Sequence, residues 1–213
     1  MNGKIAALIA AVEEVGTLEE VRRALDEGAD PLSLVEALRE GMTVVGEKYE
    51  AKEYYLPDLI LSAEIFKESI KLIEPRMQGD SIATRGTVVI GTVQGDIHDI
   101  GKNIVAAMLR CNGYDVHDLG VDIAPETFVE RASSTGAGLV AMSGLLTLAF
   151  DAMRDTVDAL AEAGLRDRLK IIIGGGPVNE KVLEYCGADA YGKDPAEAVR
   201  LARPYMGQQR ANP

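Results

Sequence analysis

Tryptophan is absent from the 213-residue sequence, and phenylalanine occurs only three times. Because 47% of the residues are hydrophobic, the core must instead be built from leucine, isoleucine, valine and alanine. Charged residues make up 26% of the chain, so the composition is that of a globular protein and excludes a disordered one. The length suits one large domain or two small ones.

Basic residues are also in short supply. The 22 Lys and Arg residues stand against 34 Asp and Glu residues, and the formal net charge is −12. We therefore expect no nucleic-acid partner, because a phosphate backbone requires a basic footprint. We attribute the acidic surface to solubility, and the alternative is that it selects a partner protein by complementary charge.

The sequence has few cysteines and no long apolar run. Cys111 and Cys186 lack the spacing of a metal site, and no His–Cys pair indicates a catalytic thiol. We find no secretory signal and no segment long enough to span a bilayer, so we expect a cytoplasmic protein without a membrane partner. Both thiols are predicted to be buried and unreactive.

The chain divides into two regions of different pattern. Residues 1–76 carry only helical signals, whereas residues 86–213 alternate strand and helix patterns. Residues 77–85, between them, include a glycine among mostly polar residues and are predicted to be a linker. The sequence thus predicts two domains.

Helix-start signals divide the first region into four helices. Thr17 and Glu20 have the spacing of a capping box, in which each side chain binds a free amide at the helix start. Asp30-Pro31 places an N-cap before proline, and Pro57 starts a further helix. Apolar residues recur at helical spacing in three segments: Ile5, Leu8, Ile9, Val12 and Val15; Leu34, Leu38, Met42, Val45 and Tyr49; and Ile60, Ala63, Phe66, Ile70 and Ile73. These patterns predict an all-α four-helix bundle.

The second region alternates two kinds of segment. Short apolar runs predict strands at 87–92, 114–119, 138–142, 170–173 and 188–191. Helical patterns follow them at 101–111, 125–134, 148–163, 179–185 and 195–205. This alternation predicts a Rossmann-like (flavodoxin-like) five-stranded parallel sheet with helices on both faces. In such folds ligands bind beyond the carboxyl ends of the strands.

The loop after the first predicted strand, Gly95-Asp96-Ile97-His98-Asp99-Ile100-Gly101, has the composition of a ligand site. Imidazole is the commonest metal ligand, so His98 is a candidate, and Asp96 can accept a hydrogen bond from its second nitrogen. Gly101 allows a large ligand to approach the backbone. The alternative is a capped helix start, with Asp99 as the capping carboxylate and His98 on the surface.

Two later loops have small or polar residues in equivalent positions. Ser143 and Thr147 follow the third strand, and Gly174-Gly175-Gly176 follows the fourth. Neither loop is specific alone, and the chain has no GxGxxG sequence after the first strand and no GK[ST] loop. Together they predict a narrow slot beside a metal-ligating histidine, which suits a long cofactor tail.

These loops carry a resemblance to a known family. Asp96-Ile97-His98-Asp99-Ile100-Gly101 resembles the DxHxxG motif of cobalamin-binding domains, Ser143-Gly144-Leu145 their SxL motif, and Gly174-Gly175 their GG motif. Residues 47–50 and 54–59 are similar to the helical cap that precedes the B12 domain in methionine synthase and in methyltransferase corrinoid proteins. The resemblance thus covers both regions of the chain.

The resemblance implies a role for each matching residue. His98 would be the lower axial ligand of cobalt in the base-off/His-on state, and Asp96 would hydrogen-bond it. Ser143 and Thr147 would contact the displaced nucleotide tail. The implied cofactor contacts are Gly95, Asp96, Ile97, His98, Asp99, Ile100, Gly101, Tyr55, Leu56, Ser143, Leu145, Thr147, Gly174, Gly175, Gly176, Tyr191 and Gly192. Of these, Tyr55 and Leu56 would cover the upper face of the corrin.

One position departs from the methionine synthase pattern. That family has a serine after the SxL segment, which extends the His–Asp relay. The matching residues here are Leu148-Ala149-Phe150, which carry no hydroxyl. We therefore predict a relay of His98 and Asp96 without a third side chain.

The resemblance implies a methyl carrier that cycles between Co(I) and methyl-Co(III) and has no turnover of its own. Its partners would be a substrate-specific methyltransferase, a methyl-acceptor methyltransferase and a reductive activase. The alternatives are the small cobalamin-binding subunit of an adenosylcobalamin mutase, a B12-based sensor, and a flavodoxin-like or metal-binding module without a corrin. The Lys102-Asn103 continuation favours the methyl-transfer branch over the mutases. The methyl donor and the oligomeric state stay open.

Overall fold

The computed structural model describes residues 2–77 and 84–206. The chain forms two compact units, one of Met1–Ala83 with Cys111–Gly113 and the other of Thr84–Arg110 with Tyr114–Pro213. We refer to them as the helical unit and the β/α unit. Residues 78–83 of the predicted linker lie outside the described part of the chain.

The helical unit consists of amphipathic helices, as predicted. Its elements are α1 (Asn2–Ala10), α2 (Glu14–Asp26), α3 (Pro31–Glu50), α4 (Leu56–Ile73) and the short 3-10 helix η1 (Glu74–Arg76). The Asp30 side chain accepts a hydrogen bond from Ser33 N at 2.9 Å, so the predicted N-cap before Pro31 is confirmed. The core of the unit is aliphatic and includes Ile5, Ile9, Leu34, Leu38, Met42, Leu59, Ile65 and Ile73.

The predicted capping box is wrong. A capping box would make Thr17 the N-cap and Leu18 the first helical residue, but α2 begins four residues earlier, at Glu14, so Thr17 lies inside the helix. The Thr17 hydroxyl donates to the carbonyl of Glu13, and the Glu20 carboxylate accepts from Lys4 and Arg23. The Thr-x-x-Glu spacing therefore marks two buried residues inside the helix and not the start of the helix.

Three predicted core positions also differ. Val12 lies in the turn after α1 with a φ of 58°, and Val15 is 68% exposed on α2. Ile60 is 47% exposed, because the buried face of α4 runs through Leu59 and Ile65 instead. The spacing of apolar residues predicted where the helices lie, but packing against neighbouring helices determines which face of each helix is buried.

The β/α unit contains a parallel sheet with strand order β2-β1-β3-β4-β5. Its strands are β1 (Thr87–Thr92), β2 (Asp115–Asp118), β3 (Leu139–Ser143), β4 (Lys170–Gly174) and β5 (Ala190–Gly192). Its helices are α5 (Ile100–Cys111), α6 (Pro125–Thr135), α7 (Ala149–Glu162), α8 (Glu180–Cys186) and α9 (Pro195–Met206). Every predicted strand and helix of this region is present, and the Rossmann-like (flavodoxin-like) fold is confirmed.

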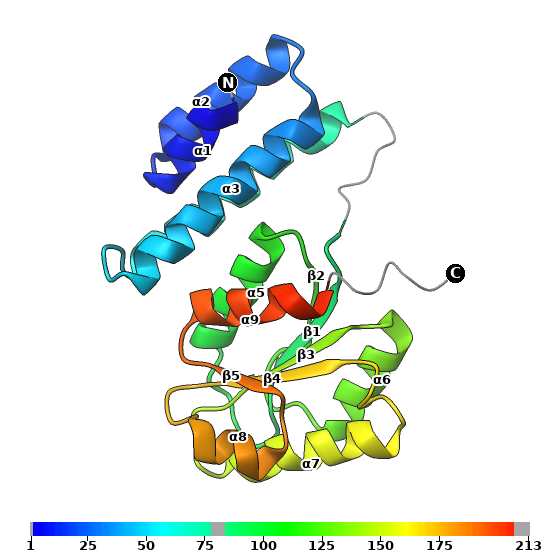
Figure 1. The fold of residues 1–213 in the computed structure, drawn as a ribbon. Helices are drawn as coiled ribbons and strands as arrows, with labels where there is room; N and C mark the ends of the chain where they lie inside the picture. Colours follow the sequence, from blue (N-terminus) through cyan, green and yellow to red (C-terminus); the bar gives the residue numbers. More distant parts are fainter. Residues whose placement is uncertain (1, 78–83, 207–213) are drawn as a thin grey trace. The chain divides into compact units, whose positions relative to one another are not determined.

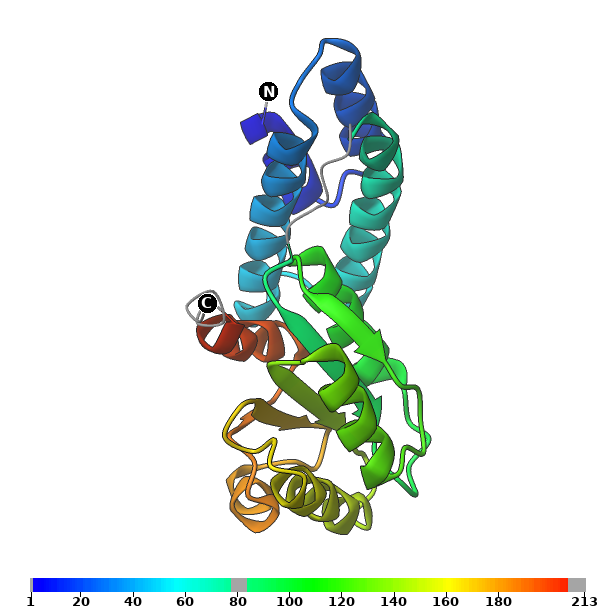
Figure 2. The same ribbon diagram turned by 90° about the vertical axis from the view of Figure 1, so that its right-hand side faces the viewer.

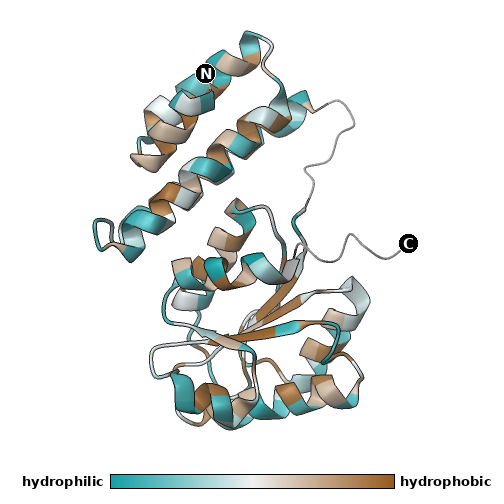
Figure 3. Cartoon of the chain, in the orientation of Figure 1, coloured by the Kyte–Doolittle hydropathy of each residue, from teal (hydrophilic) through white to brown (hydrophobic). Residues whose placement is uncertain are grey.

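The sheet is covered on both faces. Figure 1 shows α5 and α9 on one face and α6, α7 and α8 on the other, and the rotated view in Figure 2 agrees. Apolar residues are concentrated in the strands, whereas the helices alternate apolar and polar residues (Figure 3). Strand order reverses between β1 and β3, so a ligand is expected at the carboxyl ends of these two strands.

Both thiols are buried, as predicted, since Cys111 is 3% and Cys186 is 1% exposed. Burial raises the pKa of the Cys186 thiol, which keeps this sulfur protonated and unreactive. Among the described residues, no helix combines the length and the apolar character needed to cross a membrane.

Candidate cofactor-binding site

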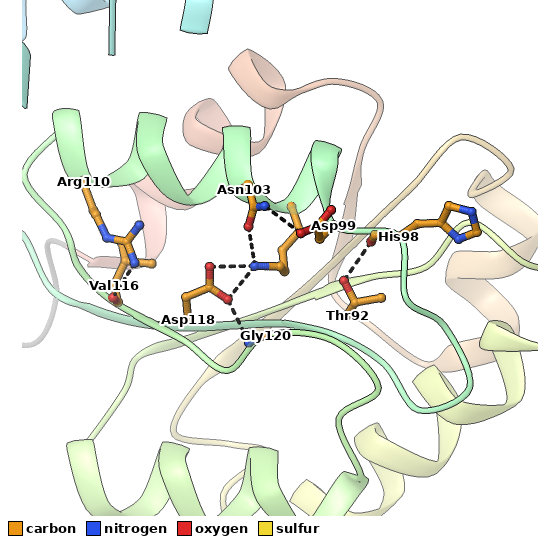
Figure 4. Close-up of polar contacts among 9 residues, drawn as sticks. Thr92, His98, Asp99, Asn103, Arg110, Val116, Asp118 and Gly120 are labelled. Atoms are coloured by element: carbon orange, nitrogen blue, oxygen red, sulfur yellow. Dashed lines mark hydrogen bonds and ion pairs between the residues drawn. The ribbon is translucent and has the colours of Figure 1, made fainter. Parts of the chain in front are cut away.

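His98 lies in the loop between the end of β1 at Thr92 and the start of α5 at Ile100. Its side chain is 48% exposed, and its Nδ1 atom lies 2.7 Å from Oδ1 of Asp96. Because Asp96 occupies Nδ1, the Nε2 atom on the other side of the ring is the one available to a metal. Figure 4 shows the imidazole pointing away from α5.

The Asp96 carboxylate is completely buried and accepts hydrogen bonds at both oxygens. Oδ1 accepts from the backbone N–H of His98 at 3.0 Å as well as facing its ring. Oδ2 accepts from the amides of Leu145 at 2.6 Å and Leu146 at 2.9 Å. Burial raises the pKa of Asp96, but the amides of His98 and Leu146, the His98 ring and the Leu145 amide together lower this pKa well below its usual value.

The Oδ2 atom of Asp96 is bound by the backbone amides of Leu145 and Leu146 and not by a third side chain. Ala149 is buried and offers no hydroxyl, while the N–H groups of Leu145 and Leu146 bind the far oxygen of Asp96. The loops after β1 and β3 are thereby tied together through one carboxylate. Backbone amides give no residue-type signal, so sequence reasoning could not find them.

The loop after β2 also binds the Gly95–Asp96 segment. Asp122, in the loop after β2, accepts from Gly95 N at 2.8 Å through its carboxylate. Its own N–H donates to the carbonyl of Asp96 at 3.0 Å. Asp122 adopts a φ of 56°, an uncommon conformation for a residue other than glycine. Sequence reasoning missed Asp122, and this strained conformation has no sequence signal of its own.

The first turn of α5 is fixed by an ion pair between the buried Lys102 and the partly exposed side chain of Asp118. Lys102 Nζ lies 2.6 Å from both carboxylate oxygens of Asp118 and 2.7 Å from Oδ1 of Asn103. Asn103 also donates to the carboxylate of Asp99 at 3.0 Å. Figure 4 shows this group beside the hydrogen bond from the Thr92 hydroxyl to the His98 carbonyl. Asp99 thus supports the start of α5 through Asn103.

A cavity of about 190 Å³ opens at the carboxyl ends of β1, β3, β4 and β5. Of the predicted site residues, it brings together Gly101, Ser143, Gly174, Gly175, Gly176 and Gly192. Gly175 has a φ of 137°, and a Cβ atom there would overlap the carbonyl oxygen of Gly144. The loops after β3 and β4 can approach so closely only because Gly175 lacks a side chain.

Other predicted contacts lie outside this cavity. Ile97 is 73% and Ile100 is 71% exposed, on either side of His98 in the chain, and Leu145 and Thr147 are also exposed. Tyr191 lies on β5 and is half-buried. The exposed apolar side chains next to His98 offer a surface for a large, flat ligand.

Two predicted contacts belong to the helical unit. Tyr55 is the N-cap residue of α4 and is 68% exposed, and Leu56 is 37% exposed. The Tyr55 amide donates to the Asp58 carboxylate at 2.7 Å, which fixes the start of the helix.

A flavodoxin-like sheet that carries at its switch point a half-exposed histidine held by a buried aspartate, together with a glycine-lined cavity at the strand ends, defines a cofactor-binding domain of the Rossmann-like class. Residues 86–200 match the family model of the B12 binding domain, and residues 2–74 match a second model of the same description. The chain belongs to this family of B12-binding proteins.

Its relatives are corrinoid proteins. The chain is 37% identical over 206 residues to a corrinoid protein of Desulfitobacterium hafniense, covering 95% of each. It is 39% identical to trimethylamine corrinoid protein 2 of Methanosarcina acetivorans over 90% of this chain and 89% of the relative. The structure resembles a chain of the methanol:cobalamin methyltransferase complex of Methanosarcina barkeri, with a TM-score of 0.84, 33% identity and coverage of 97% and 79%.

Proposed function

We propose that this chain is the corrinoid-binding methyl carrier of a corrinoid-dependent methyltransferase system. The observation that carries the proposal is the Asp96–His98 pair beside the glycine-lined cavity. Similarity to a trimethylamine corrinoid protein and to a chain of a methanol:cobalamin methyltransferase complex favours this function over a mutase subunit or a sensor.

The donor set fits a corrinoid in the base-off/His-on state. His98 offers Nε2 to cobalt from a half-exposed ring, and the cavity at the strand ends, lined by glycines, Ser143 and aliphatic side chains, would hold the nucleotide tail. When bound, the corrinoid supplies a cobalt centre that accepts a methyl group from one partner and gives it to another. The protein contributes ligation, orientation and exclusion of water.

Each site residue has a defined part in this proposal. Asp96 orients the His98 ring and keeps its own negative charge, since four N–H groups face its two oxygens. Ser143 and the glycines of the β4 loop line the tail cavity. Tyr55 and Leu56, exposed at the start of α4, shield the upper face of the corrin.

The proposal extends to domains, partners and location. We assign residues 1–76 to the cap, 77–85 to the linker and 86–213 to the cobalamin-binding domain. The partners are a substrate-specific methyltransferase, an acceptor methyltransferase and a reductive activase. All would meet the protein in the cytoplasm.

Reconstitution with hydroxocobalamin tests the proposal directly. The purified protein should take up the corrinoid, and the reduced complex should accept a methyl group from one of a panel of donor methyltransferases. His98→Ala should bind the corrinoid more weakly and shift its absorption spectrum. Failure to bind any corrinoid would defeat the proposal, and a spectrum unchanged by His98→Ala would remove His98 from the axial position.

A further inference from the structure

The cavity at the strand ends is lined by two rows of residues that differ in polarity. In the registered parallel sheet, Ser143, Gly174 and Gly192 form one row at the strand ends. Two residues earlier, Ile90, Ala141 and Ile172 form a second row on the same face. All six residues line the cavity, so its lining is small and partly polar at the strand ends, which we call the mouth, and aliphatic two residues earlier, which we call the floor.

The side walls are apolar as well. Val105 of α5 and Ala198 of α9 both line the cavity above the sheet. Two polar lining residues, Lys193 and Asp194, directly follow Gly192 of the mouth row, in the loop between β5 and α9. Asp194 Oδ1 there already accepts from Glu197 N at 2.8 Å.

Among the cavity-lining residues of α5, Lys102 is the one with a charged side chain. Its ammonium group is bound by Asp118 and Asn103 and does not face the cavity. An ammonium group has three N–H donors. Here two point at the carboxylate oxygens of Asp118 and one at Oδ1 of Asn103, at 2.6 to 2.7 Å (Figure 4). The side chain is 2% exposed, so the cavity meets its methylene stem and no spare donor.

We infer that this cavity selects a corrinoid whose tail ends in an apolar benzimidazole over one whose tail ends in a purine. The inference rests on the proposed function, because it takes the cavity as the tail site. Adenine carries ring nitrogens and an amino group that lose water on entry and find no partner beside Ile90, Ala141 and Ile172. Unpaired buried polar groups of this kind should lower affinity by about 10- to 100-fold.

The test compares the full-length protein with three ligands: hydroxocobalamin, its counterpart with adenine as the lower base, and cobinamide, which lacks the nucleotide tail. Dissociation constants come from absorption titrations. Hydroxocobalamin should bind about 10- to 100-fold more tightly than the adenine form. Equal affinity for both tailed corrinoids would overturn the inference and leave the proposed function standing, whereas binding of none would overturn both.

A polar group introduced into the cavity should change the selectivity. Val105→Thr is nearly isosteric and adds a hydroxyl on α5, so it should improve binding of the adenine form relative to hydroxocobalamin by about fivefold or more, and leave cobinamide unchanged. Val129→Thr makes the same change on α6, outside the cavity lining, and is the matched control. An unchanged ratio in Val105→Thr, or the same change in both variants, would overturn the inference.

Discussion

At the scale of single residues, the Asp96 carboxylate determines the orientation of the candidate cobalt ligand. It fixes the tautomer of His98 by occupying Nδ1, and it is itself fixed by the amides of Leu145 and Leu146. An amide side chain at this position would have to present an N–H group where the backbone already donates. The amides of Leu145 and Leu146, in the loop after β3, would then lose their buried acceptor.

Asp96→Asn should therefore weaken hydroxocobalamin binding by about 10- to 100-fold, the usual effect of removing the group that orients a metal-bound histidine. An absorption titration measures the change. Asp115→Asn is the control, because Asp115 is an exposed carboxylate beside the other histidine, His117. If Asp96→Asn bound as tightly as the unaltered protein, the proposed orienting role would be wrong.

At the scale of elements, the Lys102–Asp118 pair joins the first turn of α5 to the end of β2. Removing one partner leaves the other charge without compensation, and Lys102 is almost fully buried. Asp118→Leu should cost about 3 kcal/mol in the free energy of unfolding, measured by urea titration. The double variant with Lys102→Met should recover most of this loss, since an apolar pair replaces the ion pair. A double variant as unstable as the single one would contradict this account.

α1 and α2 are joined by a second charged cluster, which predicts a pH dependence. Hydrogen bonds from Arg23, and then from Lys4, lower the pKa of Glu20 from 4.5 to about 2. A lowered folded-state pKa stabilises the protein above pH 4.5, and this contribution is lost as the pH falls from 4.5 to about 2. Acid titration followed by circular dichroism should show this loss. Glu20→Gln should flatten the dependence, whereas Glu19→Gln, on the exposed side of the same helix, should retain it.

The elements also show what a sequence can and cannot predict. β-branched runs and the Asp30-Pro31 cap are local signals, so the strands of the β/α unit and the start of α3 were predicted correctly. A Thr-x-x-Glu spacing occurs equally well within a helix, so the prediction at Thr17 failed. At the site, residue type located the Asp96–His98 pair, but the contacts of Asp122 depend on tertiary structure and backbone amides.

At the scale of the whole molecule, we propose that residues of both units contact the cofactor, since Tyr55 and Leu56 of the helical unit would shield the corrin. A ligand at 100 times its Kd stabilises the state that it binds by about 2.7 kcal/mol. Hydroxocobalamin should therefore slow amide hydrogen exchange in the β/α unit by up to roughly 100-fold. Hydroxocobalamin should also slow amide hydrogen exchange at the start of α4. A cofactor that contacted the β/α unit alone would leave exchange in α4 unchanged.

Substitution at the start of α4 separates the two contributions. Tyr55→Ala combined with Leu56→Ala should abolish the ligand-induced protection of α4 and retain that of the β/α unit, because His98 and the tail cavity are unaltered. Val15→Ala removes a similarly exposed side chain from α2 and should change neither. Protection confined to the β/α unit in the unaltered protein would mean that Tyr55 and Leu56 do not shield the cofactor. The methyl-carrier function would then rest on the β/α unit by itself.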